Sequence, residues 1–213
     1  MEPGGGRAMP SIPSIKGSIL SGVIEDVNKL VASAAVAPRE LVRWLHSSDL
    51  ELLDKQILPS DWYDIRTYTR LNELLRDVEG EGSNEYLRES GKRTARRLLE
   101  GGLYAQLRYL HRTEVERERD PGARFEAFGR DLRLLTTLSG SILSFSRWES
   151  KPDPDHADRY RIDVTDARDF PEVLAWRSDG FVNEMATHHG DPDLWRWERA
   201  SRDLVVFRMV RSI

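Results

Sequence analysis

The sequence contains no cysteine among its 213 residues. This absence excludes disulfide bonds, thiolate metal sites and cysteine nucleophiles. Long hydrophobic runs are missing as well. No window approaches the roughly 18 uncharged apolar residues that a membrane-spanning helix needs, and no apolar stretch resembles a signal peptide. We therefore expect a cytoplasmic protein without a membrane span.

The signatures of common enzymes are also missing. The sequence has no Gly-x-Ser-x-Gly, no glycine loop that could cradle a phosphate and no His-Glu-x-x-His. Its carboxylates are spread along helix faces that we expect to be exposed, and they form no acid and base pair. The sequence motifs therefore specify no reaction.

The sequence has no large excess of either positive or negative charge. The formal net charge is −4, which argues against a general nucleic-acid-binding protein. The basic residues are 27 arginines and 5 lysines, a skew typical of a GC-rich coding bias. A basic stripe is expected on one helix side, and we interpret it as a solvated face in preference to a phosphate or acidic-partner site. Its members are Arg88, Lys92, Arg93, Arg96 and Arg97.

The chain is long enough to bury one substantial core, and no Pro/Gly linker divides its middle. Residues 1–14 are rich in Gly, Pro and Ser and hold too little apolar surface to offset their ordering entropy, so we expect a flexible leader. Residues 15–213 are expected to form a single domain.

Helical periodicity of apolar residues extends to about Leu138. Helices are predicted over residues 15–36 and 38–45, after a cap at Ser60 or Asp61, after Ser83 or Asn84, over residues 103–110, and in a last segment ending at residues 139–140. The pair Trp62-Tyr63 is placed in the first turn of the helix that follows Ser60 or Asp61.

Strand-like patterns follow this helical body. Four strands are predicted at residues 140–149, 159–165, 194–199 and 204–210, with a long hairpin loop at residues 151–158 and one helix at residues 170–188. Gly180 inside that helix is tolerable where a neighbour approaches closely. The fold class is therefore α+β: an N-terminal helical body followed by a four-stranded antiparallel sheet, with one helix inserted between strands 2 and 3.

Short motifs in the helical body resemble those of a set of bacterial proteins abundant in myxobacteria. The matching segments are residues 15–20 with Lys16-Gly17-Ser18, residues 58–63 with Leu58-Pro59-Ser60-Asp61-Trp62-Tyr63, residues 68–72 with Leu71-Asn72, and residues 102–104. That family opens with Lys-Gly-Ser and carries Leu-Pro-x-x-Trp-Tyr before a Leu-Asn helix. It looks like a distant branch of the superfamily that joins four-vinyl-reductase-type domains, haem-nitric-oxide-binding domains and TRAPP core subunits.

The resemblance implies binding rather than catalysis. Members of that superfamily hold a small hydrophobic ligand, a haem or an acyl chain between helices and sheet, or use the scaffold to assemble with partners. We therefore expect a non-enzymatic binding or sensor domain for a small hydrophobic ligand. The alternative is a TRAPP-like, dimeric interaction scaffold or adaptor in bacterial signalling, with its helical faces or the charged residues 112–120 meeting partners.

Aromatic residues are the candidates for lining a ligand pocket, since they supply apolar bulk and, for Trp and Tyr, one polar group. Core packing is the alternative for each of them. The six candidates are Trp62, Tyr63, Tyr104, Phe128, Phe145 and Trp197.

Haem can be tested on the sequence. The resemblance implies iron ligation by one helical histidine and a Tyr-x-Ser-x-Arg motif for the propionates. His111 follows Leu110 suggestively, but no Tyr-x-Ser-x-Arg occurs, and Tyr160 precedes Ile162 and Val164 instead. We interpret His111 as a solvated histidine at a helix end, and expect no haem cofactor.

One group of metal-binding residue types remains. Glu184 and His188 have the i, i+4 spacing that places two ligands on one helix face, and His189, Asp191 and Asp193 follow. The same residues are typical of a helix stop and turn, so we expect no metal. An enzyme using a metal on Glu184 and His188 is the third alternative.

Overall fold

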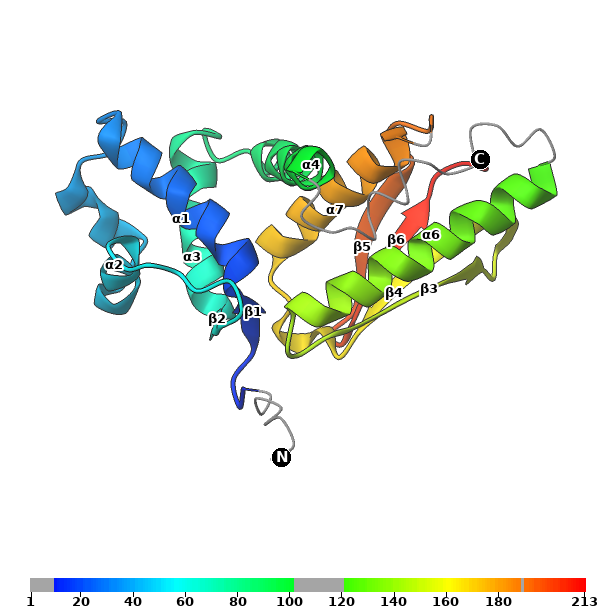
Figure 1. The fold of residues 1–213 in the computed structure, drawn as a ribbon, viewed down its shortest axis with the longest axis horizontal. Helices are drawn as coiled ribbons and strands as arrows, with labels where there is room; N and C mark the ends of the chain where they lie inside the picture. Colours follow the sequence, from blue (N-terminus) through cyan, green and yellow to red (C-terminus); the bar gives the residue numbers. More distant parts are fainter. Residues whose placement is uncertain (1–9, 102–120, 189) are drawn as a thin grey trace, which may run out of the picture.

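The computed structural model describes residues 10–101, 121–188 and 190–213. Tyr104, His111 and the charged residues 112–120 therefore lie outside the described residues, as do the predicted helix 103–110 and most of the leader. Figure 1 shows the N-terminal helices on one side of the molecule and the sheet on the other. Helices α4 (Asn84–Gly101) and α7 (Glu172–His188) lie between them.

The N-terminal part is mainly helical. Strand β1 pairs antiparallel with β2 and also forms an isolated bridge between Ile15 and Leu143. In chain order the elements are β1 (Ser14–Lys16), α1 (Gly17–Ala32), the 3₁₀ helix η1 (Pro38–Arg43), α2 (Ser47–Leu53), β2 (Trp62–Asp64), α3 (Ile65–Val78) and α4 (Asn84–Gly101).

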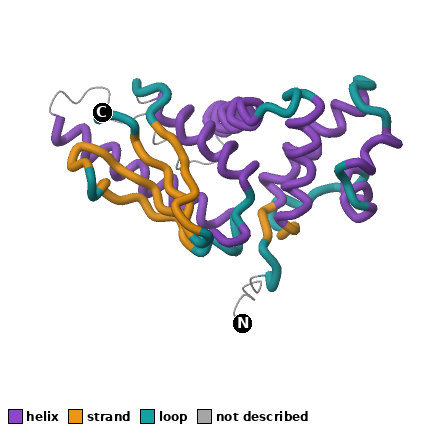
Figure 2. Tube along the Cα trace, turned by 180° about the vertical axis from the view of Figure 1, so that it is seen from behind, coloured by secondary structure: helices purple, strands orange, loops and turns teal. Residues whose placement is uncertain are grey.

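The C-terminal part is an antiparallel sheet of four strands with helices on one face. Its elements are α6 (Pro121–Ile142), β3 (Arg147–Asp153), β4 (His156–Thr165), the 3₁₀ helix η3 (Ala167–Asp169), α7 (Glu172–His188), β5 (Trp195–Ser201) and β6 (Leu204–Met209). The strand order is β3-β4-β6-β5. The predicted α+β class, with one helix between the second and third strands, is confirmed; Figure 2 shows the four strands gathered at one end.

The sheet buries one face because apolar residues alternate along its strands. Ile162 of β4 lies opposite Phe207 of β6, and Val164 lies opposite Val205. All four are buried in the core that includes residues of α6 and α7. Arg161 and Arg208, which alternate with these residues, are paired across the strands on the opposite, charged face.

The predicted start of the sheet was wrong. α6 continues through Ile142, and β3 begins only at Arg147. Ile142 lies seven residues after Leu135 and four after Leu138, so it extends the apolar stripe of the helix. Residues 142–148 alternate like a strand, but the first of these positions, Ile142, belongs to the apolar face of α6.

The predicted long hairpin loop was also wrong. β3 extends to Asp153 and β4 starts at His156, which leaves a two-residue connection. Pro152 is accommodated inside β3 because that strand is at an edge of the sheet, where a missing N–H removes no essential ladder bond.

Trp62 and Tyr63 are in strand β2 and not in a first helical turn as predicted. Helix α3 starts three residues after Trp62, and its N-cap is Asp64, whose carboxylate accepts the Arg66 N–H at 2.8 Å. The strand depends on pairing with β1, 48 positions earlier, so no local pattern predicts it.

The motif residues that carry the resemblance pack against one another. A Cβ on Gly17 would lie 2.1 Å from the carbonyl oxygen of Leu58, so only glycine permits this approach. The ammonium group of Lys16 lies 3.9 Å from the centre of the Trp62 ring and donates to the carbonyl of Ser60 at 2.7 Å. These two motifs therefore hold the start of α1 against the chain before α3.

Helices α4 and α7 cross at a reciprocal pair of glycines. A Cβ on Gly91 of α4 would lie 1.9 Å from the carbonyl oxygen of Arg177, and a Cβ on Gly180 of α7 would lie 1.8 Å from that of Arg88. Both distances are impossible for a side chain, so each helix backbone contacts the other directly. This close approach is the condition under which a glycine inside α7 is tolerable.

A buried carboxylate joins α2 to α3. Asp49 is completely buried and accepts hydrogen bonds from Arg70 at 2.6 and 2.7 Å, from Thr67 at 2.7 Å and from the His46 N–H at 2.9 Å. Burial alone would raise the pKa of Asp49, but these hydrogen bonds and the Arg70 charge together hold it below its ordinary value.

We expect Asp49→Asn to lower the free energy of unfolding by about 2 to 3 kcal/mol at neutral pH, because a charged hydrogen-bond partner of Arg70 is lost. Since the folded-state pKa is depressed, this contribution is complete above the unfolded value near 3.8 and is lost as the pH falls through the folded value. Urea unfolding at neutral pH and below pH 3.8 tests this. Asp158→Asn, at an exposed position, is the control, and a pH-independent difference for Asp49→Asn would contradict the account.

Candidate ligand-binding cavity

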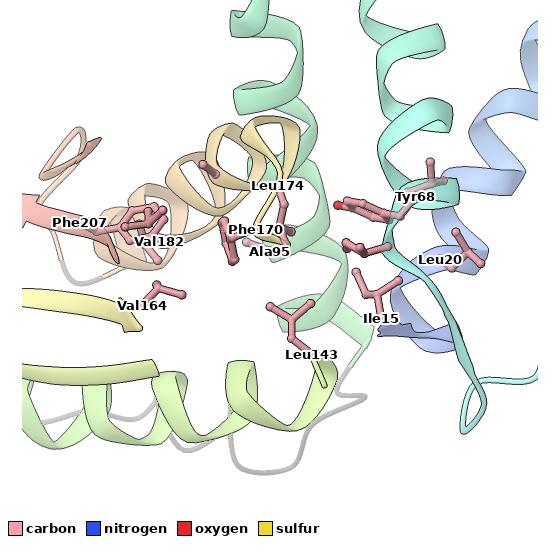
Figure 3. Close-up of a cluster of buried hydrophobic side chains, with 14 of the residues drawn as sticks. Ile15, Leu20, Tyr68, Ala95, Leu143, Val164, Phe170, Leu174, Val182 and Phe207 are labelled. Atoms are coloured by element: carbon pink, nitrogen blue, oxygen red, sulfur yellow. The ribbon is translucent and has the colours of Figure 1, made fainter. Parts of the chain in front are cut away.

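A cavity of about 280 Å³ lies between the N-terminal helices and the sheet-bearing part of the molecule. Helices α1, α4, α6 and α7 form most of its wall, Tyr68 reaches it from α3, and Trp148 reaches it from β3. Figure 3 shows three of its lining residues, Tyr68, Leu143 and Leu174, which come from α3, the end of α6 and α7.

Two kinds of side chain create this cavity. Apolar residues from four helices make most of the wall, among them Ile19, Leu98, Leu135, Leu138 and Phe181. Small residues lie between them, and because they fill little volume they leave open space; these are Ser18, Ser21, Gly22, Ser139 and Ser178. Nothing lies within 4 Å of a Cβ built on Gly22. Protein interiors are normally close-packed, so this is an unusual volume.

The cavity reaches the surface. Glu25 of α1 and Arg97 of α4 belong to its wall, and both side chains are exposed. A small molecule therefore has an opening between α1 and α4 that is marked by one acidic and one basic group.

The inner wall carries a small polar cluster around Arg177 of α7. Its Nη1 donates to Oδ1 of Asn72 at 2.6 Å, and its Nη2 donates to Oγ1 of Thr94 at 3.2 Å. The guanidinium carbon lies 5.9 Å from the centre of the Tyr68 ring. Burial raises the pKa of Tyr68, while the Arg177 charge and a hydrogen bond with Asn72 act in the opposite direction. Arg177, Thr94 and Tyr68 all line the cavity.

The sequence-predicted aromatic residues of the N-terminal part lie away from this cavity. Trp62 is stacked under Lys16. Tyr63 accepts the N–H of Leu58 on its hydroxyl at 3.1 Å. Both belong to the contact between the motif segments, and Tyr104 lies outside the described residues.

The remaining three candidates pack around the sheet. Phe128 is buried with its ring centre 6.3 Å from those of Tyr160 and Trp195. Phe145 lies 6.5 Å from Phe170. Trp197 meets the ring of Trp176 edge-on at 5.4 Å on the outer end of α7. None of these lines the cavity between the helices, and their role in ligand binding stays a prediction.

The carboxylate of Glu184 is occupied by an arginine. Arg96 donates to its two oxygens at 2.8 and 2.9 Å across the α4–α7 contact, and the side chain of His188 is not described. Within the described ranges, no three His, Asp or Glu residues are grouped to hold a metal ion. The basic stripe was predicted to be a solvated face, and this is only partly correct. Arg88 and Arg96 both bind carboxylates of α7.

Sequence reasoning missed the residues that shape the cavity. A signal was present in α1, where Ser18, Ser21 and Gly22 interrupt an otherwise apolar stripe at helical spacing. Small residues on one helix face mark either a close helix contact or a space, and only the positions of the other helices distinguish these two.

No helix in the described part of the chain has the length and apolar character needed to cross a bilayer.

Comparison of the sequence with protein-family models and with curated proteins found no match. Among solved structures, similar folds are found in H-NOX proteins. The Fe(II) unliganded H-NOX protein from K. algicida has a TM-score of 0.56 and 9% identity, over 92% of this chain and 95% of that chain. A point mutant of T. tengcongensis H-NOX has a TM-score of 0.50 and 13% identity, over 93% and 100%.

A third H-NOX structure, from work on haem distortion, has a TM-score of 0.51 and 16% identity, over 93% of this chain and 97% of that chain. At these identities the similarity shows the fold alone. The chain has the H-NOX type of fold, which agrees with the fold that the resemblance implies, and membership of the superfamily stays a prediction. The narrower family of Lys-Gly-Ser and Leu-Pro-x-x-Trp-Tyr proteins stays a prediction.

Proposed function

We propose that this chain is a non-enzymatic binding or sensor domain that holds a small hydrophobic ligand in the cavity between α1, α4, α6 and α7. The observation that carries the proposal is the cavity itself, about 280 Å³ with a mainly apolar wall. Its volume is just below the range of about 300–1,000 Å³ for ligand pockets, so the ligand is small.

The described residues of the cavity wall do not fit a haem. The H-NOX neighbours include an Fe(II) protein and structures concerned with haem distortion. In this chain, the described wall of the cavity carries no His or Met, and burial raises the pKa of Tyr68, which disfavours the tyrosinate that iron would require. The sequence also lacks Tyr-x-Ser-x-Arg, and His111 lies outside the described residues.

A cavity-filling substitution tests the proposal. Gly22→Leu adds a side chain to a wall residue whose Cβ would meet no atom within 4 Å, so the new side chain is designed to occupy cavity volume. We expect the affinity for N-phenyl-1-naphthylamine, an uncharged fluorophore that brightens in apolar surroundings, to fall by at least about tenfold, a factor equal to 1.4 kcal/mol.

Gly140→Leu is the matched control. This glycine is also helical and has open space around it, but it does not line the cavity. The control variant is expected to bind the fluorophore like the wild type. If the wild type takes up no fluorophore, or if both variants bind it equally, the cavity is not the binding site.

The competing adaptor function predicts a different bound mass and oligomeric state for the purified protein. Native mass spectrometry of the gently purified protein, with an absorbance spectrum, reports bound mass, haem and oligomeric state together. A TRAPP-like dimer without a small molecule would favour the adaptor. In the described part of the chain, one core cluster contains residues from Ile15 to Met209, which supports our proposal that residues 15–213 act as one domain, and we place this domain in the cytoplasm.

A further inference from the structure

Arg177 is a buried cation whose hydrogen-bonding partners are neutral. Its residue exposure is 7%, and its two hydrogen bonds go to the amide of Asn72 and the hydroxyl of Thr94. Within the described ranges, no carboxylate forms an ion pair with it. Two hydrogen bonds use fewer than half of the five N–H donors that a guanidinium carries.

Other arginines in comparable positions have an acid. Arg70 holds the buried Asp49, and Arg88 holds the buried Asp179. A guanidinium keeps its proton in proteins, so burial cannot neutralise it, and a buried charge without a counter-charge is costly. Among the residues that the structure describes, Arg177 therefore has no negative partner of the kind that the other two possess.

The place of Arg177 indicates where that partner belongs. The residue lies in the cavity wall together with Thr94, which binds its guanidinium, and Tyr68, whose ring it faces. The rest of the wall is mainly apolar. The other charged wall residues, Glu25 and Arg97, are exposed at the opening and not at this inner cluster.

We propose that the ligand of this cavity is a small apolar carboxylate, with its carboxylate bound by Arg177 and its apolar body held between α1, α4 and α6. This inference rests on the proposed function and specifies the ligand class. A planar guanidinium matches a carboxylate with two parallel hydrogen bonds, and such charged bonds are stronger than neutral ones.

The test compares two ligands of equal chain length on the full chain, octanoate and octan-1-ol, by displacement of N-phenyl-1-naphthylamine. The alcohol is the more hydrophobic of the two, so apolar burial alone favours it. We expect octanoate to bind at least about tenfold more tightly, as a charged hydrogen bond implies.

Two variants test whether the charge of Arg177 causes the preference for octanoate. Arg177→Met keeps most of the side-chain volume and removes the charge, so the preference for octanoate should disappear while the uncharged fluorophore still binds. Arg43→Met removes an exposed cation that does not line the cavity and should leave the preference unchanged.

The outcomes separate this inference from the function on which it rests. If the fluorophore binds in the cavity but wild-type protein prefers octan-1-ol, or binds both ligands equally, the carboxylate proposal is overturned and the hydrophobic pocket stands. If neither ligand nor the fluorophore binds, the pocket itself is refuted. Should Arg177→Met fail to fold, the wild-type comparison still decides.

Discussion

Gly180→Ala is expected to lower the free energy of unfolding by about 3 kcal/mol, the upper part of the range for overpacking. The new methyl group would lie 1.8 Å from the carbonyl oxygen of Arg88, and a backbone atom cannot rotate away as a side chain can. Helices α4 and α7 must therefore separate along their contact. For a protein of this size the loss corresponds to a decrease in Tm of roughly 6–12 °C, measured by circular dichroism.

Gly140→Ala is the control for Gly180→Ala. Both glycines are helical, but a Cβ on Gly140 meets no atom within 4 Å. The better helix propensity of alanine should raise stability by up to about 1 kcal/mol there. Equal Tm values for the Gly180→Ala variant and the wild type would show that α4 and α7 are not in backbone contact.

Arg88→Met is expected to have the second large effect, a loss of about 3–5 kcal/mol in the free energy of unfolding at neutral pH. Asp179 of α7 is 1% exposed, and Nε of Arg88 donates to it at 2.7 Å. Burial already raises the pKa of Asp179 against the effect of Arg88. Without the guanidinium, Asp179 must remain charged without its arginine or take up a proton.

The pH dependence follows from the raised pKa. An acid with a raised folded-state pKa destabilises the fold as the pH rises through that value, so the loss in Arg88→Met should shrink on acidification. The double variant Arg88→Met/Asp179→Met removes both charges and should recover most of the stability. A double variant that is less stable than Arg88→Met in urea unfolding would contradict this explanation.

Arg43→Met, at an exposed arginine, is the control and should change stability by less than about 0.5 kcal/mol.

The elements with clean periodicity could be predicted from the sequence. Tyr160, Ile162 and Val164 alternate with polar residues in β4, and the apolar spacing of α7 is equally regular, so both elements were found within a few residues of their observed ends. The start of the sheet was missed because Ile142 satisfies the helical and the strand pattern at once. Strands β1 and β2 were missed because each is stabilised by the other.

The candidate site was harder to predict than the fold. Large aromatic residues indicated a pocket, but the described ones pack among themselves or against the motif segments, whereas small residues create the cavity. Arg177 carried no sequence signal, because its burial and its neutral partners depend on α3 and α4. Asn72 and Thr94 are 105 and 83 positions away in the chain. Such contacts follow from packing and not from local pattern.

A crystal structure of the full chain grown with octanoate tests the central claim most directly. We expect the alkyl chain to lie between α1, α4, α6 and α7, near Gly22, with its carboxylate on the guanidinium of Arg177. Octanoate bound elsewhere, or a cavity filled by the protein's own side chains, would contradict the assignment of this cavity as the ligand site.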